Sequence, residues 1–327
     1  MSYFLKDYTF IDLFAGIGGF RLAWESFETK CVFSSEWNKY AKTTYYKNFG
    51  EIPHGDITKI QESDIPAHDI LCAGFPCQAF SISGKRLGFE DTRGTLFFDI
   101  ARIIKYHYPK IILLENVNHF ARHDNGKTLQ TVVSILHDLG YDIFYQVLNA
   151  SHFGVPQKRE RIYILGFRHD LKQKKFSFPK PTYQRITLQD ILLDDDKVKK
   201  YIINRNDITM KPPHTKGMMF FDKFASKPIR IGTVNKGGQG ERIYDIKGHA
   251  ITLSAYGGGV GAKTGLYQIN GVIRKLAPRE CARLMGFPDS FEIHEQNTQA
   301  YKQFGNSVVI DILQHVILAM IKQGIFN

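Results

Sequence analysis

The stretch Phe10-Ile-Asp-Leu-Phe14-Ala-Gly16-Ile-Gly18-Gly19-Phe20 decides the fold expected for this chain. An apolar run suited to a buried strand passes into a glycine loop and then into an amphipathic stretch. Glycine lets the backbone approach a ligand closely and leaves amide groups free at the start of a helix. The spacing differs from G-x-G-x-x-G, which weakens the case for a bound dinucleotide.

Strand and helix patterns alternate through the first 170 residues. The expected strands are Thr9–Phe14, Lys30–Ser34, Ile70–Ala73, Ile111–Leu114 and Arg161–Phe167. The expected helices are Phe20–Glu28, Lys39–Phe49, Phe97–Tyr106 and Gly126–Leu139. This alternation predicts an α/β fold with a doubly wound, mostly parallel sheet.

The alternation of strand and helix patterns ends after this region. Residues 172–230 are rich in Lys, Pro and Asp, and residues 232–271 carry 11 glycines in 40 positions, which indicates loops and short strands. Helical patterns return from Pro278. We therefore expect a catalytic and cofactor-binding domain made of residues 1–190 with 280–327, and a smaller irregular domain made of residues 191–279.

Charge is concentrated in one part of the chain. The formal net charge is +11, and residues 170–280 hold 21 Lys and Arg against 10 Asp and Glu, while the rest holds 22 of each. Such a segment is typical of polyanion binding, with nucleic acid the favoured partner, although a solvated basic surface has the same composition.

Composition excludes several classes of protein. An apolar content of 43% is too high for a globally disordered chain. We expect no membrane-spanning helix and no secretory signal. Four cysteines are too few for a disulfide framework in a chain of this length, so we expect a cytoplasmic protein.

Two acidic residues lie where a nucleoside site would need them. Glu36 ends the second expected strand, 20 residues after Gly16, which is the position that binds ribose hydroxyls in doubly wound folds. Asp56, within His54-Gly-Asp-Ile57, is placed for a further contact at the same sheet edge. The pattern favours an adenosine-type ligand over a tight turn with two surface acids.

A cysteine and a carboxylate follow two other strands. Cys77, in Gly74-Phe-Pro-Cys-Gln78, lies after the run Ile70–Ala73, where a thiol can be exposed and reactive. Glu115, in Glu115-Asn-Val117, follows the next strand, so we expect it at the same edge as an acid partner for the thiol. The alternatives are a structural cysteine and a helix-capping carboxylate.

Two arginines lie in Gln157-Lys-Arg-Glu-Arg161, at the start of the last expected strand. Strand alternation predicts Arg159 and Arg161 on one face, where two guanidinium groups can hold a carboxylate and a carbonyl oxygen. An exposed, charged strand end is the alternative.

Together these motifs resemble those of the DNA cytosine-C5 methyltransferases. The matches are Asp12–Gly19, Gly74–Gln78, Glu115–Val117, Gln157–Arg161 and Gly305-Asn306-Ser307, in the order of the family. The resemblance implies an S-adenosylmethionine-dependent methyltransferase fold with a smaller, irregular, glycine-rich target-recognition domain. It also implies S-adenosyl-L-methionine as cofactor and a cytosine flipped out of duplex DNA as substrate.

The resemblance also implies roles for single residues. Cys77 would attack C6 of cytosine, Glu115 would hold or protonate N3, Arg161 would bind O2, and Arg159 would hold Glu115. Glu36 would bind the ribose and Asp56 the adenine amine. The implied cofactor-binding residues are Phe14, Ala15, Gly16, Gly18, Gly19, Glu36, Trp37, Asp56, Ile57, Pro76, Leu96, Asn306 and Ser307.

For DNA, the resemblance implies that Ser83 and Gln239 fill the gap left by the flipped base. Arg242 suits a bidentate contact with guanine, and Thr252 and Tyr256 are further candidates. Residues 236–244 and 250–259 look very similar to those of a GCGC-specific member of the family, which implies GCGC with its first cytosine methylated. Residues 205–230 do not look similar.

Other functions remain open at this point. An RNA cytosine-C5 methyltransferase, or a catalytically inactive DNA-binding protein, would share much of this pattern. A dinucleotide oxidoreductase fits least, because the glycine spacing is wrong. We expect a monomer without a metal, and self-protection beside a cognate restriction endonuclease is the usual role of enzymes with these motifs.

Overall fold

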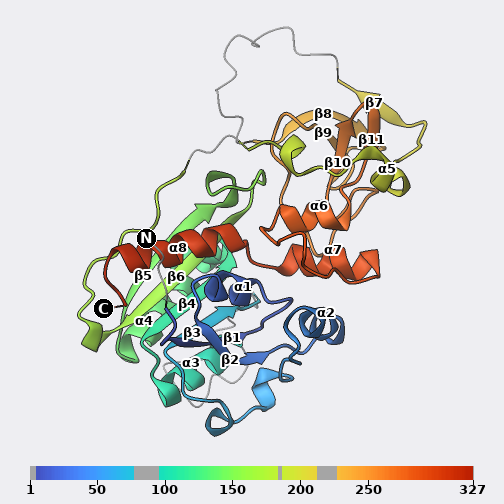
Figure 1. The fold of residues 1–327 in the computed structure, drawn as a ribbon. Coiled ribbons are helices and arrows are strands. Elements are labelled where there is room, and N and C mark those ends of the chain that lie inside the picture. The colour runs from blue at the N-terminus through green and yellow to red at the C-terminus, as the bar shows by residue number, and fades with distance from the viewer. Residues whose placement is uncertain (1–4, 77–95, 183–185, 212–226, 327) are drawn as a thin grey trace. The chain divides into compact units, whose positions relative to one another are not determined.

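The computed structural model describes residues 5–76, 96–182, 186–211 and 227–326 (Figure 1). The chain forms two compact units. The first comprises Met1–Leu148, Glu160–Pro179 and Leu313–Asn327, and the second comprises Asn149–Arg159 and Lys180–Ile312. Residues 149–159, 180–190 and 280–312, expected in the catalytic domain, therefore group with the second unit by their contacts.

The first unit is built on a six-stranded sheet in the order β2-β1-β3-β4-β6-β5. Its strands are β1 (Thr9–Leu13), β2 (Lys30–Ser35), β3 (Ile70–Gly74), β4 (Ile111–Val117), β5 (Tyr141–Asn149) and β6 (Glu160–Arg168). β1 pairs in parallel with β2 and β3, and β3 pairs in parallel with β4. β6 pairs antiparallel with β4, so the sheet is mixed and its parallel part is the one expected.

Helices flank this sheet close to the expected positions. They are α1 (Gly19–Glu25), α2 (Lys39–Phe49), α3 (Leu96–His107), α4 (Lys127–Asp138) and α8 (Ile310–Lys322). α1 ends three residues before the expected Glu28, whose φ of 63° lies in the left-handed region. β5 was not expected: its exposed central residues hide the hydrophobic pattern of a strand at the sheet edge.

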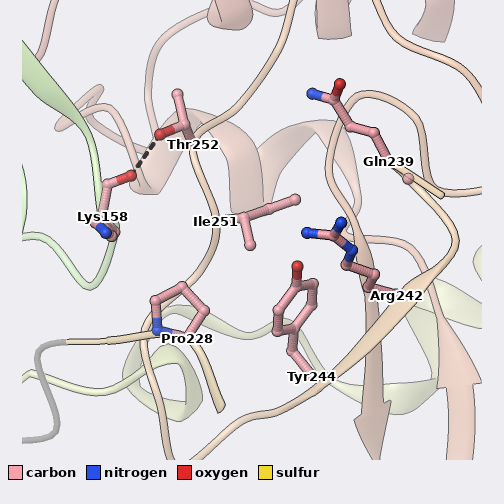
Figure 2. Close-up of a pocket in the computed structure, with 8 residues that line it drawn as sticks. Lys158, Pro228, Gln239, Arg242, Tyr244, Ile251 and Thr252 are labelled. Atoms are coloured by element: carbon pink, nitrogen blue, oxygen red, sulfur yellow. Dashed lines mark hydrogen bonds between the residues drawn. The ribbon is translucent and has the colours of Figure 1, made fainter. Parts of the chain in front are cut away.

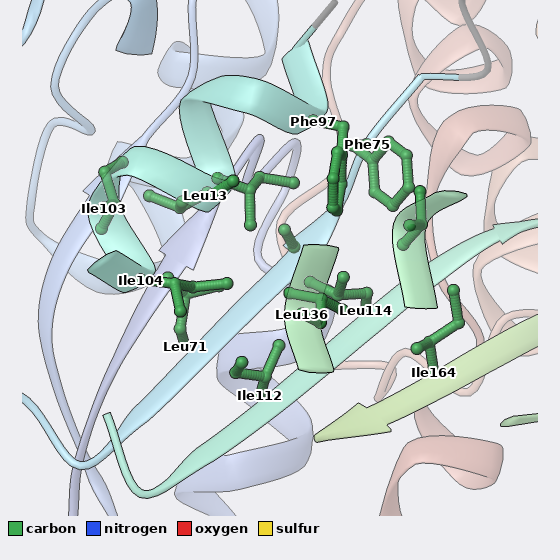
Figure 3. Packing of buried hydrophobic residues seen from close by; sticks show 14 of the residues in the cluster. Leu13, Leu71, Phe75, Phe97, Ile103, Ile104, Ile112, Leu114, Leu136 and Ile164 are labelled. Carbon is green, nitrogen blue, oxygen red and sulfur yellow. The ribbon is translucent and has the colours of Figure 1, made fainter. Parts of the chain in front are cut away.

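One face of the sheet carries the main hydrophobic core (Figure 3). Alternate strand residues such as Leu13, Leu71, Ile112 and Ile164 point to this face, as the period of two requires. The residues of α3 and α4 that complete the cluster include Phe97, Ile100, Ile103, Ile104, Leu129, Val132 and Leu136. This packing fixes the carboxyl ends of β3 and β4, which carry the chemically important motifs.

The opposite face packs against α1 and the C-terminal segment. Trp24 of α1 stacks on Phe10 and donates a hydrogen bond from Nε1 to Sγ of Cys72 over 3.0 Å. Phe326 meets the edge of Trp24, with ring centroids 6.2 Å apart. Cys31 and Cys72 are both buried, where a thiol behaves as a small apolar side chain.

The second unit contains a five-stranded sheet in the order β11-β10-β9-β8-β7. Its strands are β7 (Ile208–Met210), β8 (Ile229–Val234), β9 (Arg242–Asp245), β10 (Leu266–Ile269) and β11 (Val272–Arg274). The helices are α5 (Asp195–Val198), α6 (Pro278–Arg283) and α7 (Asn297–Asn306). Residues 232–271 form short strands and glycine turns without a helix, as expected.

A single segment in the described part of the chain, Asn297–Lys322, is long and apolar enough to cross a membrane by length and composition. An 18-residue window within it has a mean hydropathy of 1.7, but 61% of that window is buried inside the protein. Residues 307–309 are not helical and separate α7 from α8. Core helices of this composition pass the same test, so the segment is no argument for a membrane protein.

Candidate functional site

Glu115 and Arg161 form an ion pair at one edge of the main sheet. Nε of Arg161 lies 3.1 Å from Oε1 of Glu115, and the two side chains are only 14% and 11% exposed. Glu115 lies within β4, two residues before its last residue Val117, rather than after the strand as expected. Because β4 and β6 are antiparallel, the start of β6 meets the end of β4, with Arg161 opposite Val117. The sheet thus brings a carboxylate and a guanidinium group together.

The neighbouring residue Asn116 ties this edge to the end of β3. Its buried side chain donates a hydrogen bond from Nδ2 to the carbonyl of Phe75 over 3.0 Å, and its Oδ1 accepts from the amide of Val117. Phe75 also packs against Phe97 and Phe120. Cys77 and Ser83, both expected in the site, lie outside the described residues, but the chain leading to Cys77 is held at Phe75.

Arg159 lies just before β6 and is almost fully buried, with 1% of its surface exposed. Its Nη1 donates to the carbonyl of Leu253 over 3.1 Å, and its Nη2 donates to the carbonyls of Gly305 and Ser307 over 3.0 and 2.7 Å. The resemblance assigned to Arg159 the task of holding Glu115. Arg161 makes the ion pair with Glu115 described above. The implied role of Arg159 in holding Glu115 stays a prediction beside its bonds to these three backbone carbonyls.

The glycine loop turns sharply between β1 and α1. Gly16 and Gly18 have φ values of 57° and 87°, in the left-handed region that favours glycine. A Cβ at Gly18 would collide with the ring of Phe49 from α2, so a close approach also requires glycine here. The loop therefore presents backbone rather than side chains at the carboxyl end of β1.

Glu36 closes this loop from the end of β2. Its Oε2 accepts from the amide of Gly16 over 2.9 Å, and its Oε1 accepts from the amide of Asn38 over 2.7 Å. Burial raises the pKa of this carboxyl, although hydrogen bonds from backbone amides oppose the shift. A buried carboxylate beside a glycine loop without a phosphate-binding lysine suits ribose hydroxyls, so these residues fit an uncharged nucleoside portion of a cofactor.

The other expected cofactor-binding residues are placed as follows. Trp37 directly follows Glu36 and is 79% exposed, while Ala15 and Ile57 are buried. Asp56 caps a short 3-10 helix, where its Oδ1 accepts from the amide and hydroxyl of Thr58. Pro76 is exposed, and Leu96 begins α3. The structure thus joins Gly16 and Glu36 directly, whereas Asn306 and Ser307 belong to the second unit at the end of α7.

The second unit contains a pocket of about 400 Å³ that includes most of the expected DNA-binding residues (Figure 2). It is lined by Lys158, Pro228, Gln239, Gly240, Arg242, Tyr244, Ile251 and Thr252. Arg242 and Tyr244 project from the same side of β9, because alternate strand residues share a face. Tyr256 is outside this lining set and is 69% exposed.

Hydrogen bonds hold the parts of this pocket in register. The hydroxyl of Thr252 donates to the carbonyl of Lys158, as the dashed line in Figure 2 shows. Gly240 packs so closely against the backbone of Gly258 and Ala262 that no side chain would fit, and its carbonyl accepts from the amide of Gly261 over 2.7 Å. A glycine at position 240 therefore allows two loops to pack together.

Gln157 is a structural residue that the sequence interpretation did not single out. It is fully buried, its Oε1 accepts from the amide of Leu253 over 3.0 Å, and its Nε2 donates to the carbonyl of Leu284 over 2.8 Å. Its place in the Gln157–Arg161 motif was the only available signal. Among the residues described, no group of three or more His, Cys, Asp or Glu side chains could hold a metal ion.

Comparison with known proteins matches nearly the whole chain. Residues 8–322 match the family model described as C-5 cytosine-specific DNA methylase. Over 312 residues, covering 95% of this chain and 94% of the relative, the sequence is 57% identical to the type II methyltransferase M.HhaI of Haemophilus parahaemolyticus. It is 46% identical to M.HpaII of Haemophilus parainfluenzae over 324 residues, covering 94% of this chain and 88% of that protein.

Solved structures support the same fold. The Dnmt2 methyltransferase of S. pombe superposes with a TM-score of 0.71 at 21% identity, covering 97% of this chain and 99% of that one. A putative DNA modification methyltransferase encoded within an E. coli prophage has a TM-score of 0.68 at 21% identity, covering 96% and 99%. At these identities the likeness concerns the fold alone, and it agrees with the expected methyltransferase architecture.

Proposed function

Since the chain belongs to the C-5 cytosine-specific DNA methylase family, we propose that it methylates the first cytosine of GCGC in duplex DNA through a covalent bond between Cys77 and C6. It is a DNA (cytosine-5)-methyltransferase of the type II restriction-modification class. S-adenosylmethionine is its cofactor and supplies an electrophilic methyl group on a sulfonium.

The thiolate of Cys77 starts the proposed reaction by adding to C6 of the flipped cytosine. The new S–C6 bond replaces the π bond between C5 and C6, and the electron pair moves toward C5 and the ring. C5 would then take the methyl group as the bond from the methyl carbon to the sulfonium sulfur breaks, and the electron pair of that bond would stay on sulfur in the neutral product S-adenosylhomocysteine. A base removes the C5 proton, the S–C6 bond breaks, and the double bond is restored as Cys77 leaves as a thiolate.

Glu115 and Arg161 stabilise the base during these steps. A carboxyl group at N3 offsets the charge that the attack on C6 pushes into the ring, and a guanidinium group at O2 holds the same edge. The observation that carries this proposal is the buried Glu115–Arg161 ion pair at the end of β4, which supplies both groups at one place. Asn116 holds the neighbouring chain at Phe75, two residues before Cys77.

The proposed target rests on the second unit. Gln239, Arg242 and Thr252 line one pocket, and a guanidinium group is suited to bidentate contact with O6 and N7 of guanine. The identity to M.HhaI over 95% of the chain supports a GCGC target. Ser83 and Gln239 would fill the space left by the flipped base. Taking the cytosine out of the duplex costs a few kcal/mol.

We further propose a monomer that acts in the cytoplasm. A palindromic site does not require a dimer, because each strand can be methylated in turn. M.HhaI and M.HpaII are type II methyltransferases, which supports self-protection beside a cognate endonuclease as the role of this chain.

The decisive experiment measures transfer of labelled methyl from S-adenosylmethionine to matched duplexes that carry either GCGC or a scrambled site. Label on C5 of the first cytosine, in the GCGC duplex alone, is the expected result. Label on another sequence would refute the proposed target and leave the enzyme class intact. Label on RNA and none on any DNA would refute the proposed substrate.

The covalent step needs its own experiment. Cys77→Ser is expected to abolish methyl transfer while binding to the GCGC duplex survives, because the serine hydroxyl is a far weaker nucleophile. A duplex with 5-fluorocytosine at the target position should trap the native protein, because fluorine on C5 cannot leave as a proton does. Substantial turnover by Cys77→Ser, or no trapped complex with the native protein, would refute the covalent mechanism.

A further inference from the structure

Residues 250–256 carry two of the proposed DNA contacts, Thr252 and Tyr256, and are called here the recognition segment. The Gln157–Arg159 segment holds one side of it. The amide of Lys158 donates to the carbonyl of Ala250 over 2.9 Å, and the carbonyl of Lys158 accepts from the hydroxyl of Thr252. The buried Gln157 accepts from the amide of Leu253. The recognition segment is therefore fixed along its backbone, not only at its ends.

The end of α7 holds the other side of the recognition segment. A Cβ on Gly305 would come within 2.5 Å of the carbonyl carbon of Ser254 and within 2.8 Å of Cα of Ala255. No side chain larger than hydrogen fits there unless the backbone moves. Two backbones therefore lie in direct contact at Gly305, immediately before the proposed cofactor contacts Asn306 and Ser307.

Arg159 joins both sides. Its buried guanidinium group binds the carbonyl of Leu253 in the recognition segment and the carbonyls of Gly305 and Ser307, which flank Asn306. The guanidinium group is planar and rigid, so the carbonyls it binds cannot move independently without loss of a hydrogen bond. Hydrogen bonds to a charged group are stronger than those between neutral groups, which makes such a loss costly.

A contact at the surface also joins α7 to the recognition segment. Nζ of Lys302, on α7, lies 5.3 Å from the centre of the Tyr256 ring, within the range of a cation–π interaction. The ring of Tyr256 is otherwise largely exposed. The helix that ends in Asn306 thus also supports the outermost residue of the recognition segment.

We propose that Arg159 and Gly305 form a positioning device that couples cofactor binding at Asn306 and Ser307 to the placement of Thr252 and Tyr256 on DNA. The inference rests on the proposed function and on the contacts that the family resemblance implies for these four residues. A cofactor that orders the backbone at 305–307 also orders Leu253 through the shared guanidinium group. Such coupling is reciprocal: bound target DNA must tighten the cofactor by the same factor as the cofactor tightens target DNA.

The experiment measures that factor with the full chain and S-adenosylhomocysteine, which cannot react. The dissociation constant of S-adenosylhomocysteine is measured alone, with a GCGC duplex and with a scrambled duplex. For the native chain we expect the GCGC duplex to tighten binding at least tenfold, which is about 1.4 kcal/mol, and the scrambled duplex to have a much smaller effect.

Arg159→Lys and Gly305→Ala are the test variants. Lysine keeps the charge but loses the fork that reaches several carbonyls, and the alanine methyl separates the two backbones. In both variants we expect the coupling factor to fall to about two or less, whether it is measured from the binding of S-adenosylhomocysteine or from the binding of DNA. Without DNA, the dissociation constant of S-adenosylhomocysteine should change by less than about threefold. Gly258→Ala is the matched control, because nothing lies within 4 Å of the added methyl.

The outcomes separate the two proposals. The inference would be overturned if Arg159→Lys and Gly305→Ala fold but keep the coupling factor of the native chain. It would also be overturned if the control Gly258→Ala loses as much coupling as they do. It would be overturned as well if the native chain methylates DNA but shows no coupling between the binding of S-adenosylhomocysteine and of the GCGC duplex. That result would leave the proposed function intact. If neither buried variant folds, the exposed variant Lys302→Gln decides: a factor lowered at least threefold supports the coupling, and a native factor refutes it.

Discussion

Nε of Arg161 lies 3.1 Å from Oε1 of Glu115 because β6 runs antiparallel to β4. In a fully parallel sheet, the start of β6 would lie at the edge opposite the end of β4. The register places Glu115 opposite Tyr163 and Val117 opposite Arg161, so the ion pair is a diagonal contact on one face. A single reversed strand thus converts two motifs 46 positions apart in the chain into one site.

The first prediction concerns the proton at N3. Glu115→Gln keeps the size of the side chain and removes its ability to hold or donate an acidic proton. We expect the rate of methyl transfer in a single turnover to fall by about 10²–10⁴, the usual contribution of a general acid. Binding to the GCGC duplex should remain within about threefold of native. The rate is measured by rapid quench with labelled S-adenosylmethionine.

Arg161→Lys provides the comparison for Glu115→Gln. Lysine keeps one positive charge near Glu115 but cannot present two parallel donors to a carboxylate and a carbonyl oxygen. The rate should therefore fall, yet less than in Glu115→Gln. A Glu115→Gln variant that turns over within threefold of the native rate would exclude a role for this carboxyl in the chemistry.

The second prediction concerns Asn116. Asn116→Asp keeps the shape of the side chain but removes the Nδ2 donor that binds the carbonyl of Phe75. A buried carbonyl without its donor costs about 1–3 kcal/mol, so the chain before Cys77 should shift or loosen. We expect kcat to fall at least tenfold with little change in KM for DNA, as determined from steady-state rates. Equal changes in both parameters would show that Asn116 only supports the fold.

Most of the catalytic fold could be predicted from the sequence. Strands buried on both sides show continuous apolar runs, as in Ile111–Leu114, and glycine and proline mark their ends. The direction of β6 could not be predicted, because hydrophobic periodicity records which face a residue lies on but not which way its strand runs. The prediction of a mostly parallel sheet therefore left the direction of this strand open.

The role of Arg159 was the harder part of the site. Strand alternation placed Arg159 and Arg161 on one face, but β6 begins only at Glu160 and Arg159 bonds to backbone far along the chain, at Leu253 and Gly305. Such contacts depend on how distant segments fold together. Every residue has a backbone carbonyl, so the sequence does not show which carbonyls a side chain will bind. Motif order could therefore identify the residue but not its partners.

The third prediction concerns base recognition. Arg242→Ala is expected to weaken binding to the GCGC duplex by about 1–3 kcal/mol and to leave binding to a scrambled duplex nearly unchanged, because a guanine contact is specific to its base. Arg205→Ala is the matched control, since Arg205 pairs with Asp207 and lies outside the pocket lining. Binding is measured by fluorescence anisotropy at fixed salt. An equal loss on both duplexes would make Arg242 a phosphate contact.

The fourth prediction concerns stability and pH at Asp12. This side chain on β1 is fully buried, and burial raises its pKa well above the usual 3.8, although Arg21 opposes the shift. The folded state therefore holds the proton more tightly than the unfolded chain does. The sign follows from linkage: the stabilising contribution is complete below pH 3.8 and is lost as the pH rises through the folded-state pKa.

Asp12→Asn replaces the carboxyl with a neutral group of the same shape and removes this dependence. We expect the difference in the free energy of unfolding, variant minus native, to grow as the pH rises above 3.8, by at most about 1.4 kcal/mol per pH unit. Urea unfolding from pH 4 to 8 measures it. Asp207→Asn is the matched control. The hydrogen bond from Arg205 lowers the pKa of Asp207 to about 2, so its contribution is lost only as the pH falls below 3.8, and the difference should stay constant from pH 4 to 8. A difference between Asp12→Asn and the native chain that does not change with pH would show that Asp12 stays ionised in the folded protein.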